Sequence, residues 1–378
     1  MKNELIFQDD ELLFLDDEID DSQVTSSEKE YWTVLIVDDE PEVHSVTKMV
    51  LRDVEFEGKA LQFISAFTGQ EALSILEQEN DISIILLDVV MEHDHSGLEV
   101  VKTIRHQYMN EDVRIILRTG QPGQAPERTV ITEYDINDYK EKTELTVQKL
   151  YTTVIASLRT YRDLKKIKAL HSEMEMIQRE IIFTLGEITE TRSQETSFHV
   201  KRVAEYSKLL AKLAGLSEEE AEIIRLAATM HDVGKIAIPD AILNKPAKLT
   251  NDEFEEMKAH TTIGYNMLKS SQQTIIKSAS IISLQHHEKY NGNGYPLRLA
   301  GEDIHIYARI VAIADVFDAL GSERVYKKAW ELERILDLFK EERGQHFDPL
   351  LIDLFIAHLD EFLEIRDSYS ELSEIRIG

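Results

Sequence analysis

The stretch TVLIVDDE, residues 33–40, decides how the first part of this chain folds. A run of β-branched and apolar residues that ends in acids is typical of a strand buried inside a parallel sheet. Similar runs follow at residues 61–66, 83–88, 113–119 and 135–139. Amphipathic segments with helical spacing, such as residues 71–78 and 97–107, lie between the runs. Strand and helix in alternation predict an α/β domain over residues 31–145, with a doubly wound, five-stranded parallel sheet.

Polar side chains follow the ends of these runs, namely Asp38, Asp39, Asp88, Thr119 and Lys142. Because the carboxyl ends of parallel strands meet at one edge of a sheet, we expect these side chains to share a crevice. Three carboxylates there repel each other unless a cation is bound, and oxygen ligands suit Mg²⁺. One carboxylate could then attack a phosphoryl donor. Any single acid of this set could be an ordinary turn residue at the end of a strand. The whole set in this order instead indicates a functional site.

Residues 31–145 resemble the receiver domain of two-component response regulators, which has a flavodoxin-like fold. The resemblance implies phosphorylation of an aspartate by a sensor histidine kinase. The implied residues are the phospho-acceptor Asp88, the Mg²⁺ ligands Asp38, Asp39 and Asp88, and the switch residues Thr119, Tyr139 and Lys142. One departure is Glu92, which stands in a longer loop where receivers commonly place a proline after the acceptor. This departure concerns the geometry of the loop and leaves the acceptor in place.

Composition and charge exclude several classes of protein. The 378 residues include no cysteine, which excludes a disulfide scaffold, a catalytic thiol and thiolate zinc sites. The net charge of −29 argues against nucleic-acid binding, which needs clustered Lys and Arg. With neither a signal peptide nor a long apolar run, we expect a cytoplasmic protein without a membrane span. Residues 1–30 hold 11 acids and two lysines, so we expect an acidic tail that is disordered or docks on a partner.

Residues 146–190 predict one long connecting helix. They contain no proline, and apolar residues recur at steps of mostly three and four from Leu150 to Ile188. Such a stripe has to be buried, either against the chain's own domains or against a second copy. Because the stripe approximates a heptad seam, interrupted near His171, we favour a homodimeric, parallel coiled coil that could transmit a signal. Packing within the monomer is the alternative.

Residues 191–378 predict an all-α domain rich in potential metal ligands. These are Glu195, His199, His231, Asp232, His260, His286, His287 and Asp315. Glu195 and His199 are four residues apart and so lie on one face of a helix. A lone histidine such as His260 is more often a structural residue than a ligand, but eight candidate ligands in one domain together indicate a metal site. Imidazoles and carboxylates without thiolates suit Fe, Mn, Zn or Ni, and two or three such ions would support displacement at a phosphoester.

Four motifs in this part of the chain resemble the HD-GYP branch of the HD phosphohydrolases, and they occur in the same order. They are MHDVGKIAIPDAIL (230–243), KAHTTIG (258–264), HHEKYNGNGYP (286–296) and IADVFDAL (313–320). The resemblance implies hydrolysis of cyclic di-GMP to pGpG or GMP by two or three transition-metal ions, with Fe or Mn ahead of Zn or Ni. It implies that the eight residues named above are the metal ligands, with Glu195 serving a third ion.

The same resemblance implies further site residues. The implied catalytic residues are Lys235 and Asp232, and the implied substrate contacts are Tyr295, Arg324 and Lys327. Asn291 stands where an aspartate is usual and Val325 where a proline is usual, but neither change removes a ligand. We therefore expect an active site in an all-α, HD-type domain.

Together these observations predict a response regulator in which phosphorylation of Asp88 controls a metal-dependent cyclic di-GMP phosphodiesterase. One alternative is an enzyme that prefers pGpG or another cyclic dinucleotide. A second alternative is a signalling adaptor that binds nucleotides without cutting them. Activation by phosphorylation of Asp88 is the simpler expectation.

Overall fold

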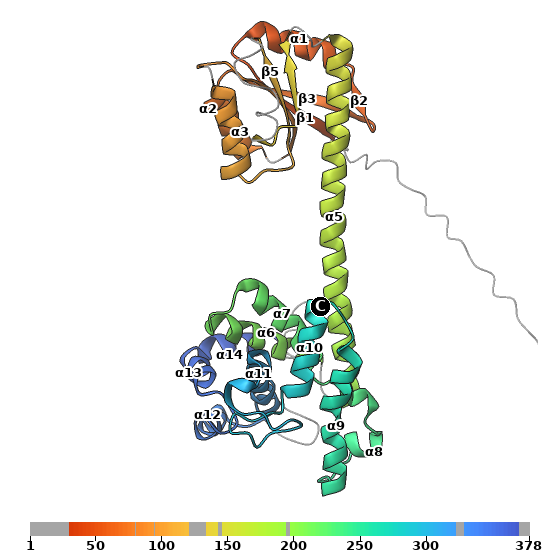
Figure 1. The fold of residues 1–378 in the computed structure, drawn as a ribbon, viewed down its shortest axis with the longest axis vertical. Helices are drawn as coiled ribbons and strands as arrows, with labels where there is room; N and C mark the ends of the chain where they lie inside the picture. Colours follow the sequence, from red (N-terminus) through yellow and green to blue (C-terminus); the bar gives the residue numbers. More distant parts are fainter. Residues whose placement is uncertain are drawn as a thin grey trace, which may run out of the picture. The chain divides into compact units, whose positions relative to one another are not determined.

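The computed structural model describes residues 30–79, 81–93, 95–120, 134–142, 146–193, 197–322 and 329–369 (Figure 1). These residues form two compact units, one up to His171 and one from Ser172, and each is described by itself. Of the predicted acidic tail, residues 1–29 lie outside the described residues. No described helix is both long and apolar enough to cross a membrane.

The first unit is built on a mixed sheet whose strands follow the order β2-β3-β1-β4-β5-β6. The strands are β1 (Tyr31–Val37), β2 (Glu55–Phe56), β3 (Lys59–Ala66), β4 (Ile82–Asp88), β5 (Arg114–Thr119) and β6 (Asp138–Glu141). The five longer strands are parallel, as predicted, and their order is that of a flavodoxin-like fold. The sequence prediction missed β2, a two-residue antiparallel edge strand next to β3.

Helices cover both faces of this sheet, because β4 and β5 are buried along their whole length and need apolar cover on each side. One face packs against α2 (Gly69–Gln78) and α3 (Ser96–Lys102), which continues into a π-helical turn, Thr103–Gln107. The other face packs against α1 (Pro41–Leu51) and the first turns of α5 (Val147–Arg192). Figure 1 shows these helices on the two sides of the sheet. The predicted doubly wound architecture is therefore confirmed.

The connecting helix α5 changes its surroundings along its length. Near its start, Leu150, Val154 and Leu158 are buried against the sheet of the first unit. Near its end, Ile182 belongs to the core of the second unit. Between and beside these contacts an apolar stripe is about half exposed or more: Ile167, Leu170, Met174, Ile177, Ile181, Leu185 and Ile188. The chain's own packing therefore buries the first part of the predicted stripe, from Leu150 to Leu158, but leaves its residues from Ile167 to Ile188 about half exposed or more.

The described part of the second unit is helical, as predicted, and contains no strand in a sheet. Its α-helices are α6 (Ser197–Leu213), α7 (Glu218–Ala228), α8 (Asp240–Leu243), α9 (Asn251–Leu268), α10 (Thr274–Gln285), α11 (Ile306–Gly321), α12 (Leu332–Glu341), α13 (Pro349–Ala357) and α14 (Leu359–Ser368). Reciprocal side-chain to backbone bonds fix where two of them begin: Ser217 with Glu220 for α7, and Thr250 with Glu253 for α9. One apolar core joins these helices and includes Tyr206, Phe317 and Phe355.

Candidate functional site

The first candidate site lies at the carboxyl edge of the sheet and brings together three of the predicted receiver residues. Asp38 and Asp88 are buried at the ends of β1 and β4. Lys142 Nζ lies 2.8 Å from Asp88 Oδ2 and 3.2 Å from Asp38 Oδ2. Burial raises the pKa of Asp88, and the ion pair with Lys142 opposes that rise. Asp39 is exposed beside Asp38 and can offer a carboxylate oxygen to the same cation.

The two remaining receiver residues also stand at this end of the sheet. Thr119 is buried as the last residue of β5, and Tyr139 is half-buried on β6. Glu92, which replaces the usual proline, accepts a hydrogen bond from the backbone N–H of Gly69, at the start of α2, over 2.8 Å. The carboxylate thus ties the loop after Asp88 to the neighbouring helix, so the unusual residue has a structural role.

Sequence reasoning missed Arg118, the residue before Thr119 on β5. Its guanidinium is buried and lies 3.3 Å from Asp38 Oδ2, and it also donates a hydrogen bond to Thr47 Oγ1 over 3.1 Å. A cation that directly follows the buried apolar run at residues 115–117 is the signal that could have revealed it, because a buried charge needs a partner. Asp38 is therefore held between Arg118 and Lys142.

The second candidate site is a cluster of buried imidazoles and carboxylates in the second unit. One group consists of Asp232, His260, His286 and His287, and another of Glu190, His199 and His231. Within each group the potential ligand atoms lie within 4.8 Å of one another. Asp315 completes the arrangement, with Oδ1 3.7 Å from His199 Nε2 and 3.8 Å from His231 Nε2. Seven of the eight predicted ligands thus converge, while Glu195 lies outside the described residues.

Asp232 connects the two groups. Its Oδ1 lies 3.1 Å from His260 Nε2 and 3.5 Å from His286 Nε2, and its Oδ2 lies 3.3 Å from His231 Nε2. Lys235 Nζ is 2.6 Å from the same Oδ2. Burial alone would raise the pKa of Asp232, but the charge of Lys235, followed by that of His231, holds it well below its usual value. Asp232 is therefore an anion placed between several nitrogen donors.

Backbone carbonyls select the nitrogen that each ring presents to the cluster. The Nδ1 atoms of His231, His260 and His286 lie 2.8, 2.7 and 3.0 Å from the carbonyl oxygens of Ala228, Met257 and Ile282. Since a carbonyl can only accept a hydrogen bond, each Nδ1 donates its proton and each Nε2 faces the cluster. This is the tautomer that metal-ligating histidines usually have.

The short distances and unsatisfied polar atoms of the cluster suit bound metal ions better than a metal-free state. The Nε2 atoms of His260 and His286 face each other at 3.5 Å, which suits a shared cation more than two neutral rings. His231 Nε2 and Asp232 Oδ1 are buried and form no hydrogen bond of ordinary geometry with the described residues. Burial alone would lower the pKa of His231, but the charges of Asp232, Asp315 and Glu190 raise it to about 9. Excess negative charge and lone pairs without a hydrogen bond are what a bound cation would relieve.

Two residues of the cluster were missed by the sequence reasoning. Glu190 is buried near the end of α5, and its Oε2 accepts hydrogen bonds from Lys235 Nζ at 3.3 Å and Ser193 Oγ at 2.7 Å. Ile182, Gly186 and Glu190 follow one another at a spacing of four on the buried side of α5. An acid at such a buried position indicates a functional residue and could have revealed Glu190. Asp318 Oδ2 lies 2.8 Å from His199 Nδ1, so it orients that ring as the carbonyls orient the others.

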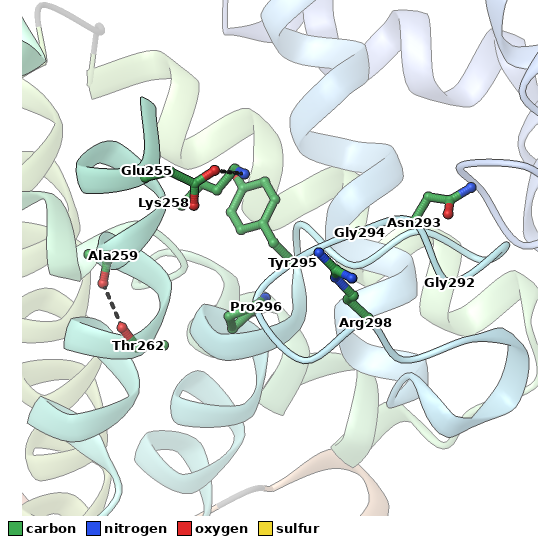
Figure 2. A pocket seen from close by; sticks show the side chains of 10 residues that line it. All are labelled: Glu255, Lys258, Ala259, Thr262, Gly292, Asn293, Gly294, Tyr295, Pro296 and Arg298. Carbon is green, nitrogen blue, oxygen red and sulfur yellow. Dashed lines mark hydrogen bonds and ion pairs between the residues drawn. The ribbon is translucent and has the colours of Figure 1, made fainter. Parts of the chain in front are cut away.

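A cavity of about 590 Å³ opens beside this cluster, between α9 and the loop around Tyr295 (Figure 2). The Tyr295 ring lies 4.8 Å from the His287 ring, so one wall of the cavity adjoins the candidate metal ligands. Lys258, Glu255 and Arg298 add charged groups to the lining. Of the predicted substrate contacts, Tyr295 therefore lines the cavity, while Arg324 and Lys327 fall outside the described residues.

Fold and site define a response regulator whose output is a helical domain with a histidine and carboxylate cluster that could hold metal ions. The family model "Response regulator receiver domain" matches residues 34–154, and the model "HD domain" matches residues 184–351. The chain is similar to several curated proteins along most of their length. It is 33% identical to 3′3′-cGAMP-specific phosphodiesterase 2 of Vibrio cholerae, with 92% of this chain and 95% of that protein covered.

The second relative is the cyclic di-GMP phosphodiesterase response regulator RpfG of Xanthomonas campestris pv. campestris. Identity to it is 36%, and the alignment covers 90% of this chain and 91% of RpfG. A cyclic di-GMP phosphodiesterase of Thermotoga maritima is 31% identical, over 88% of this chain and 92% of that protein. The chain belongs to the family of cyclic dinucleotide phosphodiesterase response regulators that join a receiver domain to an HD domain.

Proposed function

We propose that this protein is a response regulator that hydrolyses cyclic di-GMP to pGpG or GMP, and that phosphorylation of Asp88 controls the reaction. The observation that carries the proposal is that seven buried or half-buried candidate ligands, Asp232 among them, gather beside a nucleotide-sized cavity. Cavities of this volume are typical of small-molecule sites. The names of RpfG and the Thermotoga relative support cyclic di-GMP as the substrate.

Two or three ions, Fe or Mn ahead of Zn or Ni, would be held by His199, His231, Asp232, His260, His286, His287 and Asp315. Glu195 is proposed as an additional ligand, and Glu190 can contribute to the group around His199 and His231. When bound, the metal ions would supply positive charge at the phosphate and lower the pKa of the attacking water. The absence of cysteine leaves imidazoles and carboxylates as the ligands.

The chain's own residues have separate tasks in the proposed reaction. Asp232 holds His231, His260 and Lys235 in one arrangement, because its two oxygens face all three. Lys235 keeps an ammonium next to the position of the scissile phosphate, where it can offset charge that develops on the leaving oxygen. Tyr295 and, outside the described residues, Arg324 and Lys327 are proposed to bind the rest of the substrate.

Regulation is proposed to begin at the edge of the receiver sheet. Asp38, Asp39 and Asp88 would hold Mg²⁺, and a sensor histidine kinase in the cytoplasm would supply the phosphoryl group. Thr119, Tyr139 and Lys142 would respond to phosphorylated Asp88, since Lys142 already bonds to the unmodified carboxylate. The exposed middle of α5 supports a homodimer through residues 146–190, in which a second copy covers the apolar stripe.

A second candidate substrate is 3′3′-cGAMP, which differs from cyclic di-GMP in one base. It is favoured by the Vibrio cholerae relative, whose name describes it as specific for that nucleotide. A further alternative is pGpG. Both keep the same reaction at the same cluster, so they change the specificity of the proposal and not its chemistry.

The test is turnover of cyclic di-GMP, 3′3′-cGAMP and pGpG, compared side by side. The protein should be prepared anaerobically, analysed for metals, and assayed with and without beryllofluoride as a phosphoryl mimic. We expect cyclic di-GMP to be cut fastest, at a rate that beryllofluoride changes. Faster cleavage of 3′3′-cGAMP or pGpG would replace the proposed substrate. Binding without cleavage by metal-loaded protein would instead identify a nucleotide-binding adaptor.

A further inference from the structure

Arg298 has an unusual backbone conformation at the rim of the cavity. Its φ of 57° lies in the left-handed region, which glycine tolerates and a residue with a Cβ seldom adopts. Conformations of this kind cost free energy and persist where the surroundings enforce them. We therefore expect interactions with neighbouring residues to hold the backbone of Arg298 in this left-handed conformation.

The restraint is Glu288, a buried residue of the HHEKY segment. Its Oε1 accepts hydrogen bonds from the N–H groups of Leu297 at 2.6 Å and Arg298 at 3.1 Å, and its Oε2 accepts one from Leu299 at 3.1 Å. Three donors on one buried carboxylate form a strong, charge-assisted anchor. Glu288 therefore fixes the direction in which the Arg298 side chain leaves the loop.

The Arg298 guanidinium has no hydrogen-bond or ion-pair partner among the described residues, and its side chain is exposed while lining the cavity. Figure 2 shows Lys258 reaching in from α9 and Arg298 from the loop, on either side of Tyr295. Lys258 Nζ lies 5.4 Å from the centre of the Tyr295 ring, and it is paired with Glu255 at 2.6 Å. Among the described residues the cavity thus presents two cations, Lys258 and Arg298, of which only Lys258 has an ion-pair partner.

We infer that Arg298, assisted by Lys258, binds the phosphate of the cyclic dinucleotide that is not being hydrolysed. This inference rests on the proposed function. A cyclic dinucleotide carries two phosphates separated by ribose rings, so placing one at Asp232 leaves the other about one nucleotide away. The Tyr295 ring contacts the His287 ring on one side and lines the cavity on the other. The cavity therefore lies next to the metal-binding cluster, where the second phosphate would be located. A planar guanidinium suits phosphate oxygens because it can donate two parallel hydrogen bonds.

The test uses Arg298→Gly, which removes the guanidinium while easing the left-handed backbone. We expect the KM for cyclic di-GMP to rise about tenfold or more, as for the loss of a charge-assisted hydrogen bond, with little change in kcat. Bis(4-nitrophenyl) phosphate has only one phosphate. The ratio of kcat/KM for cyclic di-GMP to that for this small substrate should therefore fall by a similar factor. Arg298→Lys should lie between wild type and Arg298→Gly.

Two controls separate this inference from its alternatives. Lys277→Ala removes an exposed cation of the same unit outside the cavity, so it should leave the ratio at the wild-type value. Thermal melting should show Arg298→Gly to be at least as stable as wild type. An unchanged KM, or an equal loss on both substrates, would overturn the inference while wild-type turnover still supports the proposed function. If wild type cuts neither substrate with metal bound, the proposed function itself fails.

Discussion

Glu190 shows how one buried residue can join the connecting helix to the metal-binding cluster. It lies near the end of α5, yet its carboxylate bonds to Lys235 and belongs to the group with His199 and His231. Any displacement of the end of α5 would therefore change the position of a group that touches the proposed catalytic lysine. Glu190 is best described as a positioning residue, because it acts through Lys235.

Replacing Glu190 by Gln should test that role. The amide keeps the shape but loses the charge, so Lys235 should lose its ion pair with Glu190 and keep the one with Asp232. We expect bound metal or kcat to fall about ten- to a hundredfold, the usual effect of removing a group that orients a metal site. Metal analysis and cyclic di-GMP turnover measure both. Glu187→Gln on the same helix is the matched control, since Glu187 pairs with Lys201 away from the cluster. Equal effects of the two changes would contradict the assignment.

His346 predicts a pH dependence of stability that is separate from the metal site. Its ring stacks on Phe347 with centroids 4.2 Å apart, and burial, assisted by the charge of Lys289, lowers the pKa of His346 to about 4. An unfolded histidine has a pKa near 6.5, so between these values only the unfolded chain binds the proton. The free energy of unfolding should therefore fall as the pH drops through 6.5 toward 4.

Urea unfolding of the wild type and of His346→Gln at about pH 5 and about pH 7.5 would measure this effect. Other groups titrate in the same range, but they are shared by both proteins. We expect the wild type to lose more stability than the variant between the two pH values. Parallel losses would show that His346 is not the origin.

At the scale of single residues, the sequence allowed prediction of ligands that stand in motifs. Asp232, His286 and His287 are adjacent to other polar residues in short segments with a definite spacing. Glu190 and Arg118 escaped because the charged partner of each lies far away in the sequence. Glu190 bonds to Lys235 and Arg118 bonds to Asp38, and each of these partners is more than 40 residues away in the sequence. Pairing of that range depends on the packing of elements and is not encoded in local spacing.

At the scale of elements, a close approach of two backbones brings Asp232 to His260. Asp232 directly precedes the short 3₁₀ helix Val233–Ala237, which packs on α9 at Gly234 and Gly264. A Cβ on Gly234 would lie 1.9 Å from the carbonyl oxygen of His260 and 2.7 Å from the N of Gly264. Only glycine allows this contact, and the contact sets the distance between two proposed ligands.

Gly234→Ala should therefore separate the 3₁₀ helix from α9. Since backbone atoms cannot move aside cheaply, we expect a loss of about 2 kcal/mol or more in stability together with a loss of bound metal. Thermal melting and metal analysis report the two effects. Gly321→Ala is the matched control, because among the described residues its Cβ would meet only Ile335, at 3.8 Å. A Gly234→Ala protein with normal melting and full metal content would show that the approach is not needed.

Prediction of the elements from sequence succeeded where the periodicity was long and failed where an element was short. The five parallel strands and the helix α5 follow from repeated apolar positions. Strand β2 has two residues and forms only by pairing with β3, so no local pattern could reveal it. The last strand was expected at 135–139 but begins at Asp138, because Asp135 adopts a positive φ of 48° and turns the chain.

At the scale of the whole molecule, the exposed middle of α5 predicts self-association. Ile177 and Ile181 are each about half exposed, and with Leu170 and Met174 they repeat at steps of three and four. The double substitution Ile177→Glu and Ile181→Glu would place charges on both sides of a coiled-coil seam. We expect wild type to be a dimer and this variant a monomer by light scattering coupled to gel filtration. Gln178→Glu, on the same turn at an exposed position, is the control for added charge. A monomeric wild type would contradict the prediction.

The last prediction concerns how α5 carries the signal from Asp88 to the cluster. A helix turns by about 100° per residue, so inserting two residues beside His171 would rotate the stripe of one half against the other by about 200°. Inserting one heptad would rotate it by only about 20°. If paired copies of α5 transmit the signal through their register, the heptad insertion should keep the change in cyclic di-GMP turnover caused by beryllofluoride. The two-residue insertion should abolish that change while metal content, measured in parallel, stays the same. Equal responses of both insertions would show that the register of α5 does not carry the signal, and that control by Asp88 acts by another route.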